Sequence, residues 1–319
     1  GQRELDFDYL VYALGSMTNL NNVPGVKDYA YSLQPRGPRS AVDLRERLAD
    51  LGAKGGRVVV CGGGATGIET ATQVASVYPQ LKVSLVTREA LAHAWDKHVA
   101  DIFLKRLASL NIELLDQREI KEVLAQSVLL AGGDELACDL CIWTTGFTVQ
   151  PLARESGLTV NERDQVLVNP FLHAISHPQI YAIGDAAMPI EKPGVPHVRM
   201  SAFTASIMAA HAADCMSAEL AGKQPRPLSF SYVAQAVALG EKHALFLPLT
   251  PDDRPARPTI TGRLGAFTRE MFVGFVVTAT LSQHRFPAMF SWTGKGRYAR
   301  QQRQGSLEKS GAQQAHHLS

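Results

Sequence analysis

The chain has 319 residues, of which 45% are hydrophobic and 19% charged. This length exceeds one ordinary domain and supplies enough apolar side chains for two or three cores. The formal net charge is only +2, and no long basic stretch is interleaved with aromatic residues, which argues against a nucleic-acid-binding protein. Four cysteines are too few for a disulfide framework, so we expect a reduced, cytoplasmic location.

The two ends of the sequence also set expectations. The chain begins at Gly1 without an initiator Met and without a basic and apolar leader, so we expect that residues upstream belong to the protein. The longest apolar run near the C-terminus, Met271 to Leu281, is shorter than the roughly 20 residues that cross a bilayer. We therefore expect no membrane-spanning helix.

Hydrophobic periodicity predicts alternating strands and helices in the first half of the chain. An apolar strand over 7–15 ends at a glycine turn, and a polar helix covers about 39–51. The unit that follows has the β-turn-α-β pattern of a parallel sheet. Its expected elements are strands at 57–61, 82–87, 112–115 and 137–146, with helices at 68–77 and 96–110.

The predicted secondary structure and the composition change twice in the second half of the chain. Strands are expected at 166–168 and 180–185, and a long apolar helix is expected over about 199–220. A linker at 221–228 leads to two or three strands that end near residue 262, followed by an apolar helix. The polar residues 295–319 are predicted to be a disordered tail.

A glycine-rich turn stands between the strand that ends at Cys61 and the helix that follows. Its residues are Gly62-Gly63-Gly64-Ala65-Thr66-Gly67. The spacing G-x-G-x-x-G after a strand is the signature of a dinucleotide site: the first glycine permits the tight turn, the second lets the backbone approach the pyrophosphate, and the third lets helix and strand pack closely. The amide groups and the helix dipole then face the phosphates.

The residues near this turn leave the nucleotide open. Glu89, at the end of the next strand, is a candidate acceptor for the ribose 2′-hydroxyl of NADH, and Arg88 is a candidate partner for the 2′-phosphate of NADPH, or a solvated surface charge. Glu69 lies in the first turn of the helix. It is either a carboxylate that the helix dipole favours or a residue beside the nicotinamide.

Four further observations are the segments Tyr9 to Ser16, Gly62 to Glu69, Ile142 to Phe147, and Ile180-Tyr181-Ala182-Ile183-Gly184-Asp185-Ala186-Ala187. In this order they resemble the flavoprotein reductases with two dinucleotide-binding domains, the pyridine nucleotide-disulfide oxidoreductase superfamily. The stretches 198–205, 209–213 and 230–240 of the C-terminal third are similar to the branch of type II NADH dehydrogenases and apoptosis-inducing factor.

The resemblance implies an FAD site in the second half of the chain. Asp185 would accept hydrogen bonds from the ribityl hydroxyls, and Gly184 would leave room for the cofactor. Arg199, Met200 and Ser201, at the start of the following helix, would lie near the isoalloxazine. Gly146, at the end of the strand that returns the chain to the FAD domain, joins this cofactor-binding set. The family's first glycine-rich FAD motif has no match here, so we expect a fragment of a longer protein.

The resemblance implies an α/β fold with two Rossmann-like three-layer domains and a small α+β C-terminal domain. The FAD domain is incomplete and interrupted by the NAD(P) domain. The expected segments are 1–50 and 149–225 for the FAD domain, 51–148 for the NAD(P) domain, 226–294 for the C-terminal domain and 295–319 for the tail.

The implied activity is hydride transfer from NAD(P)H to FAD, with electrons passed on to an acceptor, for which a quinone leads and Gln235 is a candidate contact. The basic and apolar segment 264–290 is either a peripheral membrane contact on the inner face of the membrane or a helix packed on the FAD domain. Two alternatives remain: a soluble reductase for a protein or small-molecule acceptor, and a non-catalytic NAD(H)-binding module. A homodimer also stays open.

Cysteine and histidine pairs are weaker signals. Cys138 and Cys141 have the C-x-x-C spacing, but they are expected within an apolar strand, where a structural role is favoured over a redox pair. His173 and His177 are flanked by prolines that disfavour a helix, so we assign no metal.

Overall fold

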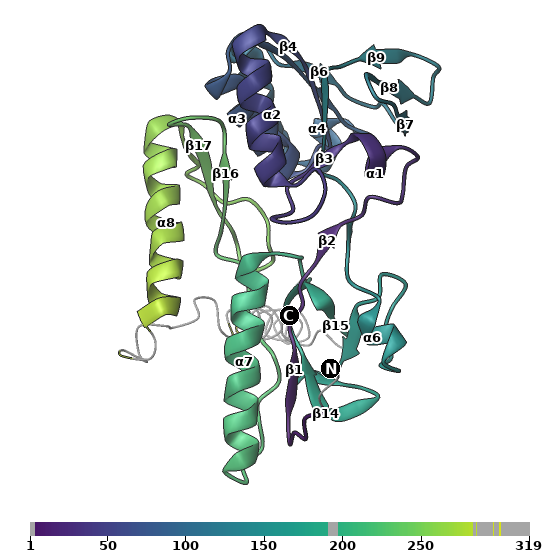
Figure 1. Ribbon diagram of the computed structural model, residues 1–319. Helices are drawn as coiled ribbons and strands as arrows, with labels where there is room; N and C mark the ends of the chain where they lie inside the picture. Colours follow the sequence, from purple (N-terminus) through teal and green to yellow (C-terminus); the bar gives the residue numbers. More distant parts are fainter. Residues whose placement is uncertain (1–3, 191–196, 283–284, 286–295, 297–299, 301–319) are drawn as a thin grey trace, which may run out of the picture.

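The computed structural model describes residues 4–190, 197–282, 285, 296 and 300. Most of the predicted disordered tail, and the part of the apolar segment 264–290 that follows residue 285, lie outside the described residues. The described chain folds as an α/β protein whose sheets are spread over three regions, which are seen together in Figure 1.

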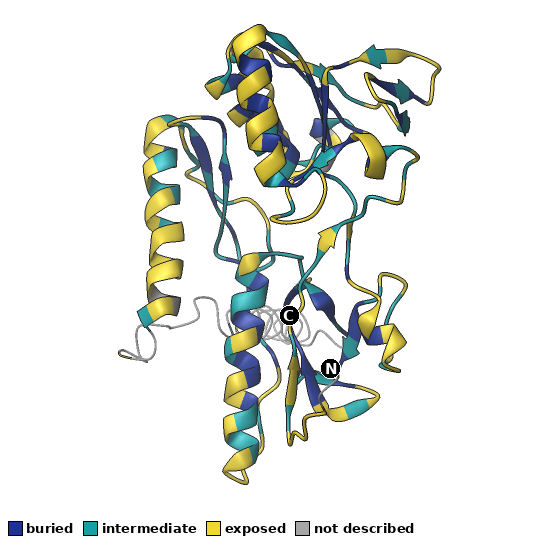
Figure 2. Cartoon of the chain, in the orientation of Figure 1, coloured by how far each residue is buried: buried dark blue, intermediate teal, exposed yellow. Residues whose placement is uncertain are grey.

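A five-stranded parallel sheet in the order β3-β10-β4-β5-β6 forms the centre of the upper region in Figure 1. Its central strands β10 and β4 are mainly apolar because they are covered on both faces, and most of their residues are buried, dark blue in Figure 2. The strands are β3 (Tyr31–Ser32), β10 (Leu140–Trp143), β4 (Gly56–Cys61), β5 (Leu81–Val86) and β6 (Glu113–Leu115).

Alternate residues of β4 face two different layers. Val58 and Val60 pack in the core that includes residues of helices α2 (Ala41–Lys54), α3 (Ala65–Val77) and α5 (Lys97–Ser109). Val59 and Cys61 pack in a second core with residues of an antiparallel three-stranded sheet. This second sheet consists of β7 (Ile120–Val123), β8 (Ser127–Leu130) and β9 (Glu135–Ala137), and the short helices α1 (Val26–Tyr29) and α4 (Leu91–Ala94) complete the region.

A second five-stranded sheet, in the order β1-β14-β13-β12-β15, lies in the lower region and brings together segments far apart in the chain. β1 pairs with β14 in parallel, with Leu10 opposite Ile180. Helix α7 packs beside the 3₁₀ turn at 184–186, which follows β14. The elements are β1 (Leu10–Tyr12), β12 (Val166–Val168), β13 (His173–Ala174), β14 (His177–Ala182), β15 (Ala187–Pro189), α6 (Leu152–Glu155), a 3₁₀ turn (Gly184–Ala186) and α7 (Ala202–Leu220).

Two crossings join these regions. β2 (Met17–Thr18) leads from the lower to the upper region of Figure 1, and β11 (Phe147–Thr148) follows the last strand of the upper region. The two strands pair antiparallel. The last region is a three-stranded antiparallel sheet of β16 (Ala234–Ala238), β17 (Ala244–Pro248) and β18 (Ile260–Thr261), against which α8 (Gly262–Ser282) packs. β16 also contacts α3, so the C-terminal region touches the nucleotide region directly.

The domain boundaries stay predictions, but two details differ from the sequence expectations. β3 pairs with β10, so residues 31–32 lie in the upper sheet, whereas the predicted division at residue 50 assigns them to the FAD segment. The long apolar helix begins at Ala202 rather than near Arg199, because the side chain of Ser201 accepts a hydrogen bond from the Thr204 amide and caps it there.

Candidate functional site

The glycine-rich turn opens into a cleft of about 450 Å³. Gly62 has a φ of +131°, which a residue with a side chain rarely adopts, and no side chain caps the N-terminus of α3. The first amides of α3 are thus left for a ligand. The cleft is lined by Asn22, Val23, Gly62, Gly63, Gly64, Val86, Thr87, Arg88, Glu89, Trp95, Arg118, Glu119, Ile120, Trp143, Thr145 and Gly146.

Gly67 explains why α3 packs so closely on the turn. A Cβ atom at this position would lie 1.8 Å from the carbonyl oxygen of Gly62 and 2.9 Å from Oγ1 of Thr144. Gly64, by contrast, has open space where a Cβ would stand. The third glycine of the motif therefore serves packing, and the second borders the cleft, which is the division of roles that a dinucleotide site needs.

The other predicted nucleotide residues have three different positions. Arg88 and Glu89 line the cleft beside Gly62–Gly64, and both are exposed. Ala65 and Thr66 form the first turn of α3 without lining the cleft. Glu69 has a protein partner that neither sequence interpretation predicted: its Oε1 accepts a hydrogen bond of 2.7 Å from the Ala238 amide, which ties α3 to β16.

A second groove, of about 710 Å³, lies between α7 and the segments that follow β1 and β14. It brings together the predicted residues Gly184, Asp185 and Ser201; Met200 lies just before Ser201 and does not line it. Gly184 has a φ of +67° and stands close to Ala205. Apart from Ile183 and Asp185, the lining residues have small side chains or none. The lining residues are Ala13, Gly15, Ile183, Gly184, Asp185, Ser201, Ala202, Ala205, Ser206, Ala209, Ala210 and Ala213.

Asp185 is the one carboxylate in this groove. Its Oδ2 accepts a hydrogen bond of 2.6 Å from the hydroxyl of Ser16. Its Oδ1 is buried and has no hydrogen-bond partner among the described residues. A buried carboxylate oxygen without a donor is costly, so this atom is prepared to accept a hydrogen bond from a ligand hydroxyl.

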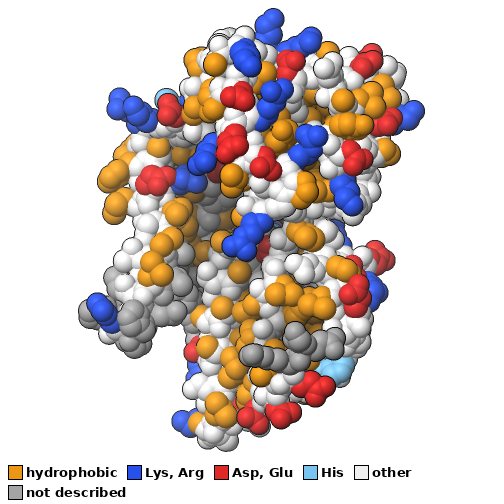
Figure 3. Space-filling view, viewed as in Figure 1, with side chains coloured by type: hydrophobic (Ala, Val, Ile, Leu, Met, Phe, Trp, Pro, Cys, Tyr) orange, Lys and Arg blue, Asp and Glu red, His pale blue; other side chains and the backbone are white. Residues whose placement is uncertain are grey.

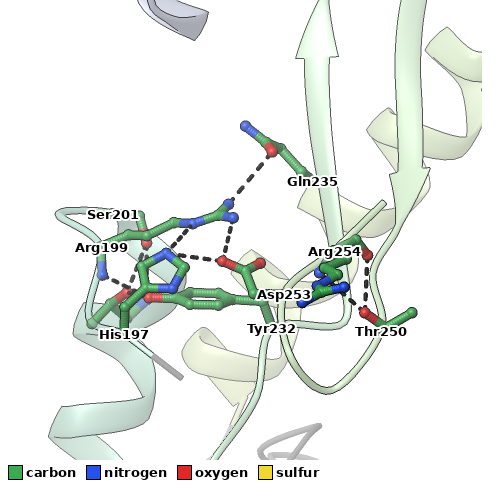
Figure 4. Close-up of polar contacts among 9 residues, drawn as sticks. His197, Arg199, Ser201, Tyr232, Gln235, Thr250, Asp253 and Arg254 are labelled. Atoms are coloured by element: carbon green, nitrogen blue, oxygen red, sulfur yellow. Dashed lines mark hydrogen bonds and ion pairs between the residues drawn. The ribbon is translucent and has the colours of Figure 1, made fainter. Parts of the chain in front are cut away.

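The segment that leads into α7 is held by a charged cluster, which Figure 4 shows. The Arg199 guanidinium pairs with Asp253 and lies over the ring of Tyr232, 4.7 Å from its centre. His197 Nε2 lies 2.9 Å from Asp253 Oδ2. Burial raises the pKa of Asp253, and the nearby Arg199 and His197 offset this only in part. Asp253 comes from the loop after β17, so the cluster joins the C-terminal region to α7.

Gln235, the candidate quinone contact, belongs to this cluster. Its Oε1 lies 3.4 Å from Nη1 of Arg199 and accepts a hydrogen bond from it. Gln235 stands on β16 and its side chain points toward Arg199 in Figure 4.

The cysteine pair differs from the sequence expectation in one respect. Cys141 lies in β10, but Cys138 precedes that strand, because β9 ends at Ala137 and the chain turns at Asp139. Both thiols are buried, and burial raises the pKa of Cys138 to about 12. Cys141 Sγ instead lies 3.6 Å from Sγ of Cys61 on the neighbouring strand. A protonated, buried thiol is a poor nucleophile, which favours the structural role.

Sequence reasoning missed four residues. Arg118 and Trp95 line the nucleotide cleft, and the indole of Trp95 donates a hydrogen bond of 3.2 Å to the carbonyl of Gly63. Ser16 binds Asp185, and Asp253 binds Arg199. Ser16 belongs to the first segment of the resemblance and could have been found there. The other three lie outside any motif.

Residues 1–214 match the sequence profile of the family described as pyridine nucleotide-disulphide oxidoreductase. Among curated proteins, demethylphylloquinone reductase NdbB of Synechocystis sp. is 28% identical over 77% of this chain and 62% of its own length. Ferroptosis suppressor protein 1 of Xenopus tropicalis is 26% identical over 74% and 63%. The chain thus spans less than two thirds of the length of these relatives.

Solved structures share the fold. NDH2 from Plasmodium falciparum in complex with NADH superposes with a TM-score of 0.69 at 18% identity, over 92% of this chain and 76% of that one. Putidaredoxin reductase, in its covalent complex with putidaredoxin, gives 0.62 at 25% identity, over 77% and 58%. With the two clefts and the family match over most of the chain, the protein belongs to the pyridine nucleotide-disulphide oxidoreductase family.

Proposed function

We propose that the protein is an FAD-dependent NAD(P)H oxidoreductase that passes electrons to a quinone. The observation that carries the proposal is the pair of clefts, one at the glycine-rich turn and one at Asp185. The names of relatives support it, since they include a demethylphylloquinone reductase and a type II NADH:quinone oxidoreductase from Haemophilus influenzae.

The residues of the second groove, along α7, fit a flavin. Its small side chains leave space for a flat ring system, and the unpartnered Oδ1 of Asp185 suits a ribityl hydroxyl. Ser201 and Ala202 place the N-terminus of α7 at this groove, where the helix dipole favours negative charge. FAD, when bound, supplies the hydride and electron transfer, which no protein side chain provides.

This chain's own residues bind and orient the nicotinamide nucleotide. Gly62, Gly63 and Gly64 border the cleft directly before α3, where their backbone amides and the helix dipole would stabilise the diphosphate. Glu89 accepts from the ribose at one end of the cleft, and Gly146 borders it near the crossing toward the lower region. The bound nucleotide is thereby extended from the upper sheet toward the flavin groove.

The proposal that the electron acceptor is a quinone held in a membrane depends on α8. Many of its exposed side chains are apolar, as Figure 3 shows along this helix, and the exposed Arg263 and Glu270 lie in its first half. An apolar helix face supports a peripheral contact with the membrane that holds the quinone. Within the described residues, no helix combines the length and hydrophobicity needed to span a bilayer. The exposed residues are Leu264, Phe267, Met271, Val273, Phe275, Val277 and Leu281.

The function is tested with the full-length protein loaded with FAD. Anaerobic addition of NADH or NADPH is expected to bleach the flavin absorbance, and a short-chain quinone is expected to restore it. If a protein or dye acceptor restores the flavin absorbance and the quinone does not, the electron acceptor is a soluble molecule rather than a quinone. Nucleotide binding without bleaching would leave only a non-catalytic binding module.

Asp185→Ala is expected to weaken FAD binding about 10- to 100-fold, because the ligand loses a hydrogen bond to a charged group. The free energy of unfolding should change little, since the substitution also removes a buried oxygen without a partner. The measurement is the dissociation constant of FAD, followed by its fluorescence. Ser16→Ala, which removes only the protein's own partner of Asp185, is the control and should have the smaller effect. Unchanged FAD affinity in Asp185→Ala would contradict the assignment.

A further inference from the structure

A third cavity, of about 450 Å³, shares no lining residue with the two clefts. It is lined by Gln73 of α3, by residues 240–243 of the turn between β16 and β17, and by the first turns of α8. In Figure 1 this turn lies beside the upper end of α8, where that helix begins. The function proposed above does not use this cavity.

The walls of the third cavity are held by two close backbone approaches. At Gly240, whose φ is +86°, a Cβ would stand 2.0 Å from Oγ of Ser76 and 2.8 Å from the carbonyl oxygen of Thr72, so the turn lies directly on α3. At Gly265 a Cβ would stand 2.3 Å from the carbonyl oxygen of Ala244, so α8 lies directly on β17. Because both approaches fix the walls, a ligand would not have to order them.

Positive charge in this cavity exceeds negative charge. Its charged lining residues are Lys242, Arg263 and Arg269 against Glu241 and Glu270. Arg269 and Glu270 form an ion pair with each other. The other ion pairs within the described residues involve neither Lys242 nor Arg263. Two cations from separate elements therefore line one cavity, with the exposed carboxylate of Glu241 as the remaining negative charge.

The position of Arg263 gives a second reason to expect an anion here. The helix α8 has 21 residues, begins at Gly262 and carries no acidic residue in its first turn. Because the N-terminal end of a helix is electropositive, a cation there is unfavourable unless a negative charge lies close to it. An anion in the cavity would offset both the helix dipole and the Arg263 guanidinium.

We propose that the third cavity binds a phosphate group between Lys242 of the β16–β17 turn and Arg263 of α8. A guanidinium presents a fork of N–H donors that matches two phosphate oxygens, and the ammonium of Lys242 adds a compact charge from the other element. Ala238, Ala266 and Phe267 also line the cavity and offer an apolar surface to the organic part of a phosphate ester.

The phosphate ester has two possible sources. A soluble phosphate monoester would occupy the cavity alone. A phospholipid would place its headgroup there and its chains along α8, because Phe267 lines the cavity and also belongs to the exposed apolar residues of that helix. The recognition chemistry, a phosphate held by Lys242 and Arg263, is the same in both cases.

The first test is titration of the protein with phenyl phosphate at constant ionic strength, followed by calorimetry, with and without saturating NAD⁺. Lys242→Gln and Arg263→Gln are each expected to weaken binding about tenfold. Glu241→Gln is expected to strengthen it, because the variant removes the carboxylate that competes for the two cations. Arg45→Gln, an equal change of charge on the exposed side of α2, is the matched control and should leave the affinity unchanged. Circular dichroism checks that each variant is folded.

Vesicles distinguish the two sources of the phosphate. Co-sedimentation compares vesicles of phosphatidylcholine with vesicles that also contain phosphatidic acid. A loss of phenyl phosphate binding in Lys242→Gln and Arg263→Gln assigns the site to a soluble ester. A loss confined to the phosphatidic acid vesicles assigns it to a lipid headgroup. Unchanged binding of both probes in these variants, no binding of either probe by the wild type, or displacement of phenyl phosphate by NAD⁺ would overturn the site.

Discussion

Gly67→Val is expected to abolish dinucleotide binding and to lower the free energy of unfolding by about 3 kcal/mol or more. The added Cβ would stand 1.8 Å from the carbonyl oxygen of Gly62, which is backbone and has no rotamer to escape into. Thr144, whose hydroxyl donates a hydrogen bond of 2.7 Å to the carbonyl of Cys61, blocks a second direction at 2.9 Å. Relief requires α3 to move away from β4, which breaks the turn that forms the cleft.

The measurement combines urea unfolding, followed by circular dichroism, with titration of NADH. Gly64→Ala is the matched control from the same turn. Its Cβ would meet nothing within 4 Å, and the φ of −74° suits alanine, so stability should stay within about 1 kcal/mol of the wild type. The new methyl group nevertheless borders the cleft where the diphosphate is expected, and NADH binding should weaken. If the Gly64→Ala variant binds NADH with the affinity of the wild type, the diphosphate does not bind at this turn.

The glycine-rich turn was predictable because its determinants are local. An apolar strand, three glycines at fixed spacing and a helix-forming stretch lie within about one β-α unit, and the structure places them together at a cleft. Arg118 was not predictable in the same way. It reaches the cleft because the chain between β6 and β7 hydrogen-bonds to the end of β5, a tertiary contact without a sequence signature.

The charged cluster at α7 shows the same limit. The run Asp252-Asp253-Arg254 has the composition of an exposed turn, and Asp252 and Arg254 do form an open ion pair. The side chain of Asp253, between them, is 1% exposed because the loop folds over the segment that precedes α7. Only the position of Arg199, 54 residues earlier in the chain, distinguishes the buried aspartate from its neighbours.

Arg199→Ala is expected to lower the free energy of unfolding by about 3–5 kcal/mol, the cost of leaving a buried charge without its partner. Among the described residues, Asp253 keeps His197 as an ion-pair partner, and Tyr232 loses the guanidinium that lies over its ring. The measurement is urea unfolding at neutral pH. Arg254→Ala, which removes the exposed arginine of the same loop, serves as the comparison and should cost less than about 1 kcal/mol.

A double-mutant cycle then separates charge from packing. Asp253→Asn removes the buried charge, so Arg199→Ala should cost much less in that background, and the coupling between the two sites should reach about 1–3 kcal/mol. Additive losses would mean that Arg199 stabilises the protein through contacts other than Asp253, such as its stacking on Tyr232 and its hydrogen bond to Gln235. Because Asp253 lies in the C-terminal region and Arg199 lies two residues before Ser201, which caps α7 at the groove, a strong coupling would show that this ion pair stabilises the contact between the C-terminal region and the start of α7.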